Sequence, residues 1–188
     1  MDKDFKRPRF FGISAEPRIG KTTAIRKLAL MVKKRGVEYT GVAQPAIVEV
    51  RGKREIVWGY RLLDLVTGES RPFARKTKGD EAGMGFRLEK EGFDWAAKRI
   101  KRPAPLLIVD ELGWVEARGK GHLPAIEDAL ASGAVSAVVL TFRPQLGDTF
   151  IERLNSLYDG DPRIWRLKKK KEEKPEAKWL EELFSELD

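Results

Sequence analysis

Two continuous apolar runs constrain the fold of this 188-residue chain more than any other feature. Residues 106–109 carry no polar side chain, and residues 134–142 contain only Ser136 and Thr141 as polar ones. Strands that are apolar on both faces are typical of parallel sheets that helices cover on both sides. Each run is far too short to cross a bilayer as a helix. The chain is therefore expected to bury a central parallel sheet.

Strand-like and helix-like segments alternate along most of the chain. Between residues 22 and 35 the apolar side chains recur at helical spacing, and Gly36 then ends the helix. Such alternation favours a parallel sheet with helices on both faces. The same criteria predict strands at 9–14, 37–42, 86–88, 106–109, 134–142 and 163–167, and helices at 22–35, 93–102, 123–132, 146–157 and 176–187.

Residues 46–75 differ from this pattern. Short runs rich in Val, Ile and Tyr are separated by turn residues, which is typical of antiparallel hairpins. The polar segment 76–85 contains three glycines and is expected to be a mobile loop. The predicted fold class is α/β, a three-layer sandwich whose mostly parallel sheet carries an added antiparallel ribbon. We expect a single domain over residues 1–188, with a basic, helical extension at 168–188.

Composition excludes several kinds of site. Cysteine is absent and His122 is the one histidine, so disulfides, cysteine-based zinc sites and multi-histidine metal sites are excluded. The first residues contain no apolar signal segment, and we expect a cytoplasmic protein without membrane association. The chain contains few Asn and Gln residues and many Lys, Arg and Glu residues. This composition is typical of heat-adapted proteins and suggests a thermophilic source.

The net charge of +8 is compatible with nucleic-acid binding, but equally with nucleotide binding. Part of the excess is local, because residues 168–171 are four consecutive lysines. We interpret this run as a solvated edge or linker, and we do not favour nucleic acid as a partner.

The strongest chemical motif follows the first predicted strand. Residues 15–22 (Ala-Glu-Pro-Arg-Ile-Gly-Lys-Thr) fit the relaxed phosphate-loop pattern, and they lie between a predicted strand and a predicted helix, as the motif requires. Backbone N–H groups of such a loop bind phosphate, the lysine reaches the β- and γ-phosphate oxygens, and the Thr22 hydroxyl coordinates Mg²⁺. The predicted nucleotide-binding residues are Ala15, Glu16, Pro17, Arg18, Ile19, Gly20, Lys21, Thr22 and Thr23.

Arg18 stands where this loop usually has glycine. If the position requires a positive φ, a side chain there costs about 1 kcal/mol. Two interpretations stay open: Arg18 points to solvent, or it supplies a cation near the phosphates.

A second motif ends the apolar run at 106–109, where Asp110 and Glu111 follow directly. In phosphate-loop enzymes an Asp at this point holds Mg²⁺, usually through water, and a following Glu can orient and activate the attacking water. We therefore predict that Thr22 and Asp110 hold Mg²⁺ and that Glu111 is the general base. A glutamate here favours hydrolysis over phosphoryl transfer to a second substrate.

Four segments together resemble a known family. They are Gly-Lys-Thr-Thr at 20–23, the Glu-Val-Arg and Asp-Leu-Val-Thr-Gly-Glu ribbon motifs within 49–69, Val-Asp-Glu-Leu-Gly at 109–113 with Glu116, and Thr-Phe-Arg at 141–143. From residue 10 to about 167 the chain resembles the THEP1-type, or cancer-related, nucleoside triphosphatases. The resemblance implies a P-loop NTPase fold and Mg²⁺-dependent hydrolysis of NTP to NDP and phosphate. It also implies broad tolerance of the base and a monomer.

The chain departs from this family at Trp114 and Val115, which stand where Lys-Met is usual. We expect Trp114 to pack in the core, as we do the other tryptophans, and His122 to lie at the surface. Arg51 and Arg143 lie in the family-like segments and are candidates, with Lys21 and Glu111, for the catalytic set, since a cation stabilises the transition-state charge.

The predicted function is Mg²⁺-dependent hydrolysis of nucleoside 5′-triphosphates, including ATP and GTP. No Asn-Lys-x-Asp base-recognition motif is present, so base selectivity is expected to be loose. Two alternatives stay open. One is a nucleotide or polynucleotide kinase, for which Lys76, Lys78 and Arg87 around the 76–85 loop could form a basic lid. The other is a nucleic-acid-associated ATPase.

Overall fold

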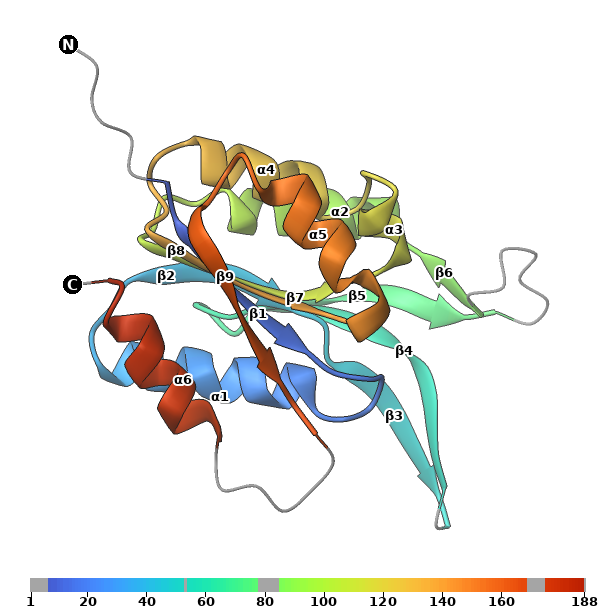
Figure 1. The fold of residues 1–188 in the computed structure, drawn as a ribbon. Coiled ribbons are helices and arrows are strands. Elements are labelled where there is room, and N and C mark those ends of the chain that lie inside the picture. Colours follow the sequence, from blue (N-terminus) through green and yellow to red (C-terminus); the bar gives the residue numbers. More distant parts are fainter. Residues whose placement is uncertain (1–6, 53, 78–84, 169–174, 188) are drawn as a thin grey trace.

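A computed structural model describes residues 7–52, 54–77, 85–168 and 175–187. These residues form one nine-stranded sheet between two layers of helices (Figure 1), which confirms the predicted three-layer α/β arrangement. The strands are β1 (Arg9–Ser14), β2 (Tyr39–Ala43), β3 (Ala46–Arg51), β4 (Arg54–Asp64), β5 (Ser70–Lys76), β6 (Phe86–Leu88), β7 (Leu106–Leu112), β8 (Ala137–Phe142) and β9 (Asp159–Arg166). The helices are α1 (Lys21–Lys34), α2 (Lys90–Ile100), α3 (Trp114–Ala117), α4 (Leu123–Ala131), α5 (Gly147–Leu154) and α6 (Pro175–Phe184), with a 3₁₀ turn η1 (Pro144–Leu146).

The order of the strands brings the two sequence motifs to one edge of the sheet. Strands β2, β7, β8, β1 and β9 are parallel neighbours in that order. Phe142 at the end of β8 pairs with Ser14 of β1 on one side and with Leu112 of β7 on the other. The phosphate loop after β1 and the Asp-Glu pair in β7 therefore meet across the end of β8.

The predicted antiparallel ribbon is confirmed. Strand β4 joins β2 in antiparallel orientation, and β5 and β6 extend the sheet beyond it, while β3 pairs with β4 as a hairpin that projects from the sheet (Figure 1). The ends of β1 and β6 are as predicted, but β7 runs three residues further than expected and includes both carboxylates of its motif. The expected loop at 76–85 lies largely outside the described residues.

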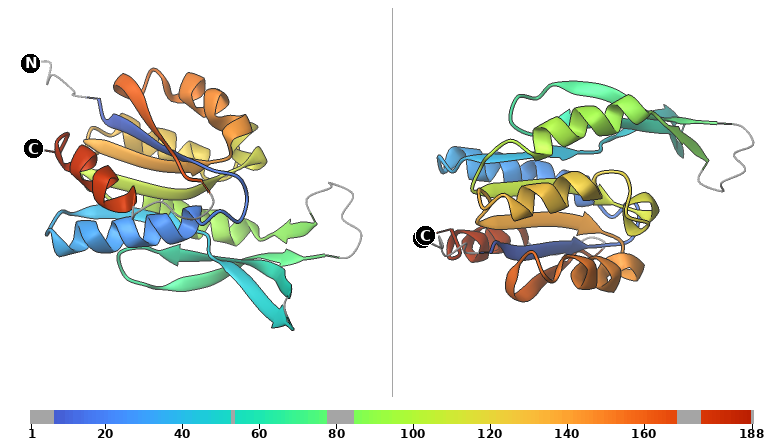
Figure 2. Two further views of the ribbon diagram at one scale, coloured as in Figure 1. Left: turned by 60° about the horizontal axis from the view of Figure 1, so that its bottom comes forward. Right: turned by 90° about the horizontal axis from the view of Figure 1, so that it is seen from above.

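Two hydrophobic clusters fill the space on the two faces of the sheet. Helices α2, α4 and α5 cover one face, and α1 and α6 lie side by side on the other (Figure 2). Apolar side chains alternate between the two clusters along the central strands: Leu107 and Val109 face the first, and Leu106 and Ile108 face the second. The continuous apolar run thus arises because both sides of β7 are buried.

The apolar stripe of the C-terminal extension packs on the α1 face. Trp179, Leu180 and Leu183 of α6 are buried there, and the Trp179 ring stacks on Trp165 of β9 with centroids 5.1 Å apart. Most of the lysine run at 168–171 lies outside the described residues. Helix α6 is therefore part of the hydrophobic core.

Replacing Trp179 with alanine should lower the free energy of unfolding by about 3–5 kcal/mol, because a fully packed aromatic side chain is lost. Phosphate release measured well below the melting temperature should stay near that of the parent, since Trp179 stacks on Trp165 of β9 in the hydrophobic core and is not among the residues proposed for the site. Urea denaturation gives the stability. An unchanged denaturation midpoint would contradict the packing of α6, and normal melting with lost turnover would place the extension in the site.

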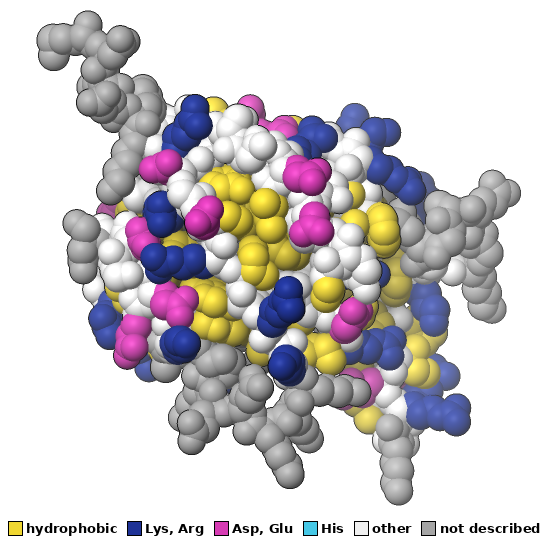
Figure 3. All heavy atoms as spheres, viewed as in Figure 1, with side chains coloured by type: hydrophobic (Ala, Val, Ile, Leu, Met, Phe, Trp, Pro, Cys, Tyr) yellow, Lys and Arg dark blue, Asp and Glu magenta, His cyan; other side chains and the backbone are white. Residues whose placement is uncertain are grey.

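The face of the molecule drawn in Figure 3 carries charges of both signs. Over the middle of that face, acidic and basic side chains are interspersed around an apolar area. Among the described residues, no helix is long and apolar enough to span a membrane.

Candidate active site

The phosphate loop connects the buried end of β1 to the first turn of α1. Ala15 is buried, the next three residues are exposed, and Gly20 has a φ of 110°, a left-handed conformation that glycine adopts without steric cost. Arg18 also has a positive φ, 65°, so the cost expected for a side chain at this position applies. Its own side chain is exposed.

Lys21 holds the loop in shape from inside. Its side chain is only 4% exposed, and Nζ donates to the backbone oxygens of Ala15 at 2.8 Å and Glu16 at 3.4 Å. The same Nζ lies 3.5 Å from Oε1 of Glu111. The ammonium group is therefore buried among three acceptors, where a phosphate oxygen could replace the carboxylate as its charged partner.

Asp110 is fully buried at the end of β7 and is held by two neighbours. Its Oδ1 accepts the Thr141 hydroxyl at 2.7 Å, and its Oδ2 accepts the backbone N–H of Gln44 at 3.1 Å. Strands β8 and β2 flank β7, so both donors come from the neighbouring strand ends. This arrangement orients the carboxylate and leaves its remaining lone pairs for water or a cation.

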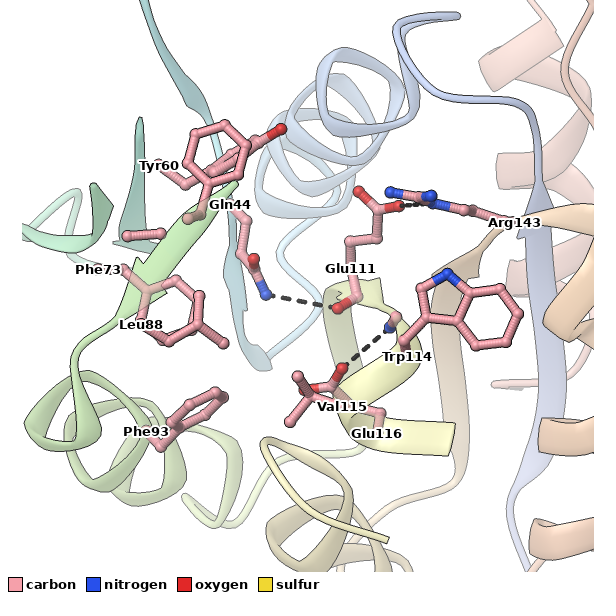
Figure 4. Close-up of a pocket in the computed structure, with 13 residues that line it drawn as sticks. Gln44, Tyr60, Phe73, Leu88, Phe93, Glu111, Trp114, Val115, Glu116 and Arg143 are labelled. Carbon is pink, nitrogen blue, oxygen red and sulfur yellow. Dashed lines mark hydrogen bonds and ion pairs between the residues drawn. The ribbon is translucent and has the colours of Figure 1, made fainter. Parts of the chain in front are cut away.

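Glu111 lies between two cations. Its Oε1 is 3.5 Å from Nζ of Lys21 and 3.6 Å from Nε of Arg143, and Figure 4 shows the Arg143 and Glu111 side chains pointing toward each other. Burial raises the pKa of Glu111 above its usual range, and the charge of Asp110 adds to this, while Lys21 and Arg143 oppose it. Nε of Arg143 is buried without a hydrogen-bond partner among the described residues.

Comparison with known proteins agrees with this geometry. The model of a family described as NTPase matches residues 10–176, which is most of the chain. The chain belongs to this NTPase family. The match includes the phosphate loop, the Asp-Glu pair and Arg143.

Similar proteins and solved structures are named as THEP1 or as nucleoside triphosphatases. The NTPase is 31% identical over 128 residues to the nucleoside-triphosphatase THEP1 of Pyrococcus abyssi, covering 66% of this chain and 69% of that protein. It is 27% identical over 122 residues to the nucleoside-triphosphatase THEP1 of Caldivirga maquilingensis, covering 64% of this chain and 68% of that protein. In structure it resembles a human cancer-related nucleoside triphosphatase, with a TM-score of 0.66, 18% identity and coverage of 95% and 96%. THEP1 from the hyperthermophile Aquifex aeolicus matches with a TM-score of 0.64, 19% identity and coverage of 96% and 99%. These similarities confirm the expected P-loop NTPase fold.

Glu116 closes the loop that follows β7 in this NTPase. The carboxylate is buried and accepts the backbone N–H groups of Gly113 at 2.9 Å and His122 at 3.1 Å. Burial raises its pKa, which those two hydrogen bonds partly offset. Gly121 packs so closely that a Cβ there would lie 2.1 Å from Oε1 of Glu116. Both oxygens of Glu116 are thus bonded to the loop backbone.

The expectation that His122 lies at the surface was wrong. Its side chain is buried beside Phe73 and Phe93, and burial lowers its pKa to about 4. The imidazole is therefore neutral near pH 7, and its Nε2 accepts a hydrogen bond from Gln44 at 3.0 Å. Packing by the ribbon and α2 buries this residue, although its local sequence is polar and rich in glycine.

Trp114 differs from expectation in its position, and the catalytic role of Arg51 stays a prediction. Trp114 does not pack in the core but is 50% exposed at the edge of a cavity beside Glu111. Arg51 lies at the end of the β3–β4 hairpin, where it bonds Glu49 at 2.8 Å and stacks on Trp58. The structure brings Lys21, Asp110, Glu111 and Arg143 together, but it gives Arg51 partners only in its own hairpin among the described residues.

Gln44 is the site residue that sequence reasoning missed. Besides the backbone bond to Asp110, its side-chain amide donates to the backbone oxygen of Glu111 at 3.4 Å and contacts His122. A usable signal was present: Gln44 lies two residues after the strand predicted at 37–42, and the carboxyl ends of parallel strands converge at ligand sites.

Proposed function

We propose that this NTPase-family enzyme hydrolyses nucleoside 5′-triphosphates to the diphosphate and phosphate, with Mg²⁺ as cofactor, by in-line attack of water on the γ-phosphorus. One observation carries the proposal: Lys21 of the phosphate loop and Arg143 both lie within 4 Å of the same Glu111 oxygen. A general base and two cations thus converge at one point, as γ-phosphate hydrolysis requires.

The proposal assigns a separate role to the loop backbone and to each of three side chains. The backbone of residues 15–23 binds the phosphates, and Lys21 neutralises charge on the β- and γ-oxygens. Glu111 accepts the proton of the attacking water, for which its raised pKa suits it. The buried Nε of Arg143 forms an ion pair with Glu111 but no hydrogen bond among the described residues, and Arg143 stabilises the charge that spreads over the γ-phosphoryl oxygens.

Thr22 and Asp110 offer the oxygen ligands that Mg²⁺ prefers. This ion takes one or two protein groups and keeps several waters and phosphate oxygens. When bound, the ion neutralises negative charge on the phosphates. Asp110 is oriented for this task by Thr141 and Gln44.

The proposal is tested by measuring products. Purified protein with Mg²⁺ should release one phosphate for each diphosphate formed from ATP, GTP, CTP or UTP, and chelation of the metal should stop the reaction. Rates for the four nucleotides should be similar, because the sequence contains no base-recognition motif. Absence of phosphate release from all four would refute the proposed hydrolysis.

Replacing Asp110 with asparagine should raise the Mg²⁺ concentration needed for half-maximal phosphate release by at least about tenfold, the range found when groups that position a metal's ligands are removed. The reason is the loss of one negative charge beside the ion. Asp128→Asn is the matched control, because it removes an equal charge from an exposed aspartate of α4, and it should leave the Mg²⁺ dependence unchanged. Equal Mg²⁺ dependence in Asp110→Asn and the parent would rule out this role.

Turnover should depend on pH through Glu111. The base acts only when deprotonated, and burial raises its pKa above the ordinary value of 4.5. The value of kcat/KM, which reports on the free enzyme, should therefore fall as the pH decreases through that raised pKa, at a higher pH than for an ordinary carboxylate. Measuring kcat/KM against pH for the parent and for Glu111→Gln tests this, since the acidic limb should disappear in the variant.

A further inference from the structure

A cavity of about 330 Å³ opens beside Glu111, between the ribbon and the loop after β7. One wall consists of Tyr60, Phe73, Phe86 and Leu88, from strands β4, β5 and β6. Trp114 and Val115 of α3 form the opposite wall (Figure 4). Glu111 and Arg143 also line it.

The cavity adjoins the phosphate loop, where the proposed function places the γ-phosphate. Glu111 lines it and also contacts Lys21 of the phosphate loop at 3.5 Å. The electrostatic surroundings of Tyr60 agree: burial raises its pKa, the charge of Glu111 adds to this, and Arg143 and Arg18 oppose it. The ribbon wall, the base and the phosphate loop therefore share one site.

Hydrolysis alone does not require this space. A water molecule occupies about 30 Å³ of liquid volume, so the cavity is roughly ten times larger. Its size lies at the lower end of the range for small-molecule sites. Apolar walls of this kind also bind water poorly, whereas they bind planar organic molecules well.

The lining residues define the chemistry of such a molecule. Tyr60 and Phe86 meet edge to face with centroids 5.2 Å apart, and Trp114 presents a half-exposed indole from the other side. Among the described lining residues Arg143 is the single cation, and it faces Glu111, while Glu116 is a second carboxylate. The lining offers an anionic acceptor, such as a nucleotide or a polynucleotide end, one cation, and Glu111 already pairs with it. The cavity suits a neutral, planar molecule.

We propose that the cavity binds a small, neutral aromatic alcohol, such as a hydroxymethyl-substituted ring or a nucleoside, and that its hydroxyl receives the γ-phosphoryl group. The hydroxyl oxygen forms a bond to the γ-phosphorus, and the bond from that phosphorus to the β,γ-bridging oxygen breaks, with its electron pair leaving on the diphosphate. The hydroxyl proton passes to Glu111 and then to solvent. This inference rests on the proposed function, in which the triphosphate is bound and water attacks when the cavity is empty.

The test follows products from Mg·ATP with benzyl alcohol, 3-pyridinemethanol or uridine at millimolar concentration. We expect ADP to exceed free phosphate by the amount of phosphoester formed, which phosphorus NMR detects directly. If ADP and free phosphate stay equal with all three probes, phosphoryl transfer is refuted. The reaction without alcohol is run in parallel, because phosphate release there reports on hydrolysis alone and separates a failure of this inference from a failure of the proposed function.

Two tryptophans of similar exposure provide matched variants. Trp114, 50% exposed, lines the cavity, whereas Trp58, 44% exposed, lies on the β3–β4 hairpin. Trp114→Ala should raise the KM for the alcohol by about tenfold or more, the range for loss of an aromatic stacking partner. Trp58→Ala should leave both the KM for the alcohol and phosphate release unchanged. Equal effects of the two substitutions on that KM would overturn the assignment of the cavity.

Discussion

Replacing Lys21 with alanine should weaken ATP binding by at least about a hundredfold. The ammonium group would make at least two charge-assisted contacts with the β- and γ-phosphate oxygens, each worth about 1.5–3 kcal/mol. No other described side chain occupies its position: Nζ is buried against Ala15, Glu16 and Glu111. Removing it also leaves the Glu111 carboxylate without the cation that lies 3.5 Å away, so the carboxylate repels the phosphates further.

Binding of a fluorescent ATP analogue measures this loss. Lys33→Ala is the control, because Lys33 is an exposed lysine in the last turn of the same helix and the substitution removes an equal charge. Its affinity for the analogue should match that of the parent. An unchanged affinity in folded Lys21→Ala protein would mean that residues 15–22 do not bind phosphate.

Replacing Glu111 with glutamine should reduce phosphate release by roughly 10²–10⁴-fold while Mg·ATP still binds, since that is the range expected for loss of a general base. Glutamine keeps the shape of the side chain but cannot accept the proton of the attacking water. Steady-state phosphate release and nucleotide affinity, together with melting curves, separate the effect on chemistry from effects on binding and folding.

Glu116 provides the contrasting carboxylate for this experiment. Both of its oxygens accept backbone N–H groups, so Glu116→Gln would turn an amide NH₂ group toward one of those donors. This substitution should lower the melting temperature, and turnover should follow the folded fraction. If Glu111→Gln instead hydrolyses ATP within about threefold of the parent, far short of a general-base loss, another group must position the water.

Local sequence was sufficient to predict the elements that form the site. The strand before the phosphate loop and the apolar run before Asp110 are both buried on two faces, and such runs have few other structural solutions. The motif residues follow predicted strands, but which strands are neighbours, and hence that the motifs meet, comes from the observed pairing of β1, β8 and β7. The sequence placed Lys21 and Glu111 in one catalytic set, but it could not give the 3.5 Å distance between their charged atoms.

The ribbon side of the site could not be predicted in the same way. His122 and Trp114 stand in a short stretch without clear periodicity, so neither burial nor exposure follows from their neighbours. Phe73 and Phe93 bury His122 from segments about 30 to 50 residues away, while Trp114 has no such cover. Arg51 belongs to a hairpin whose two strands pair with a register shift between Ile47 and Val48, which local sequence does not predict.

The two walls of the cavity differ in how freely they can change. The loop on the α3 side is fastened by Glu116 and leaves no room for a side chain at Gly121, so mutations there disturb the residues next to Glu111. The opposite wall belongs to the antiparallel ribbon, which contributes neither the phosphate loop nor the base. Mutations in Tyr60, Phe86 or Leu88 could therefore alter which molecule fits while the phosphate chemistry persists. A lineage of such proteins could diversify in ligand choice through the ribbon alone.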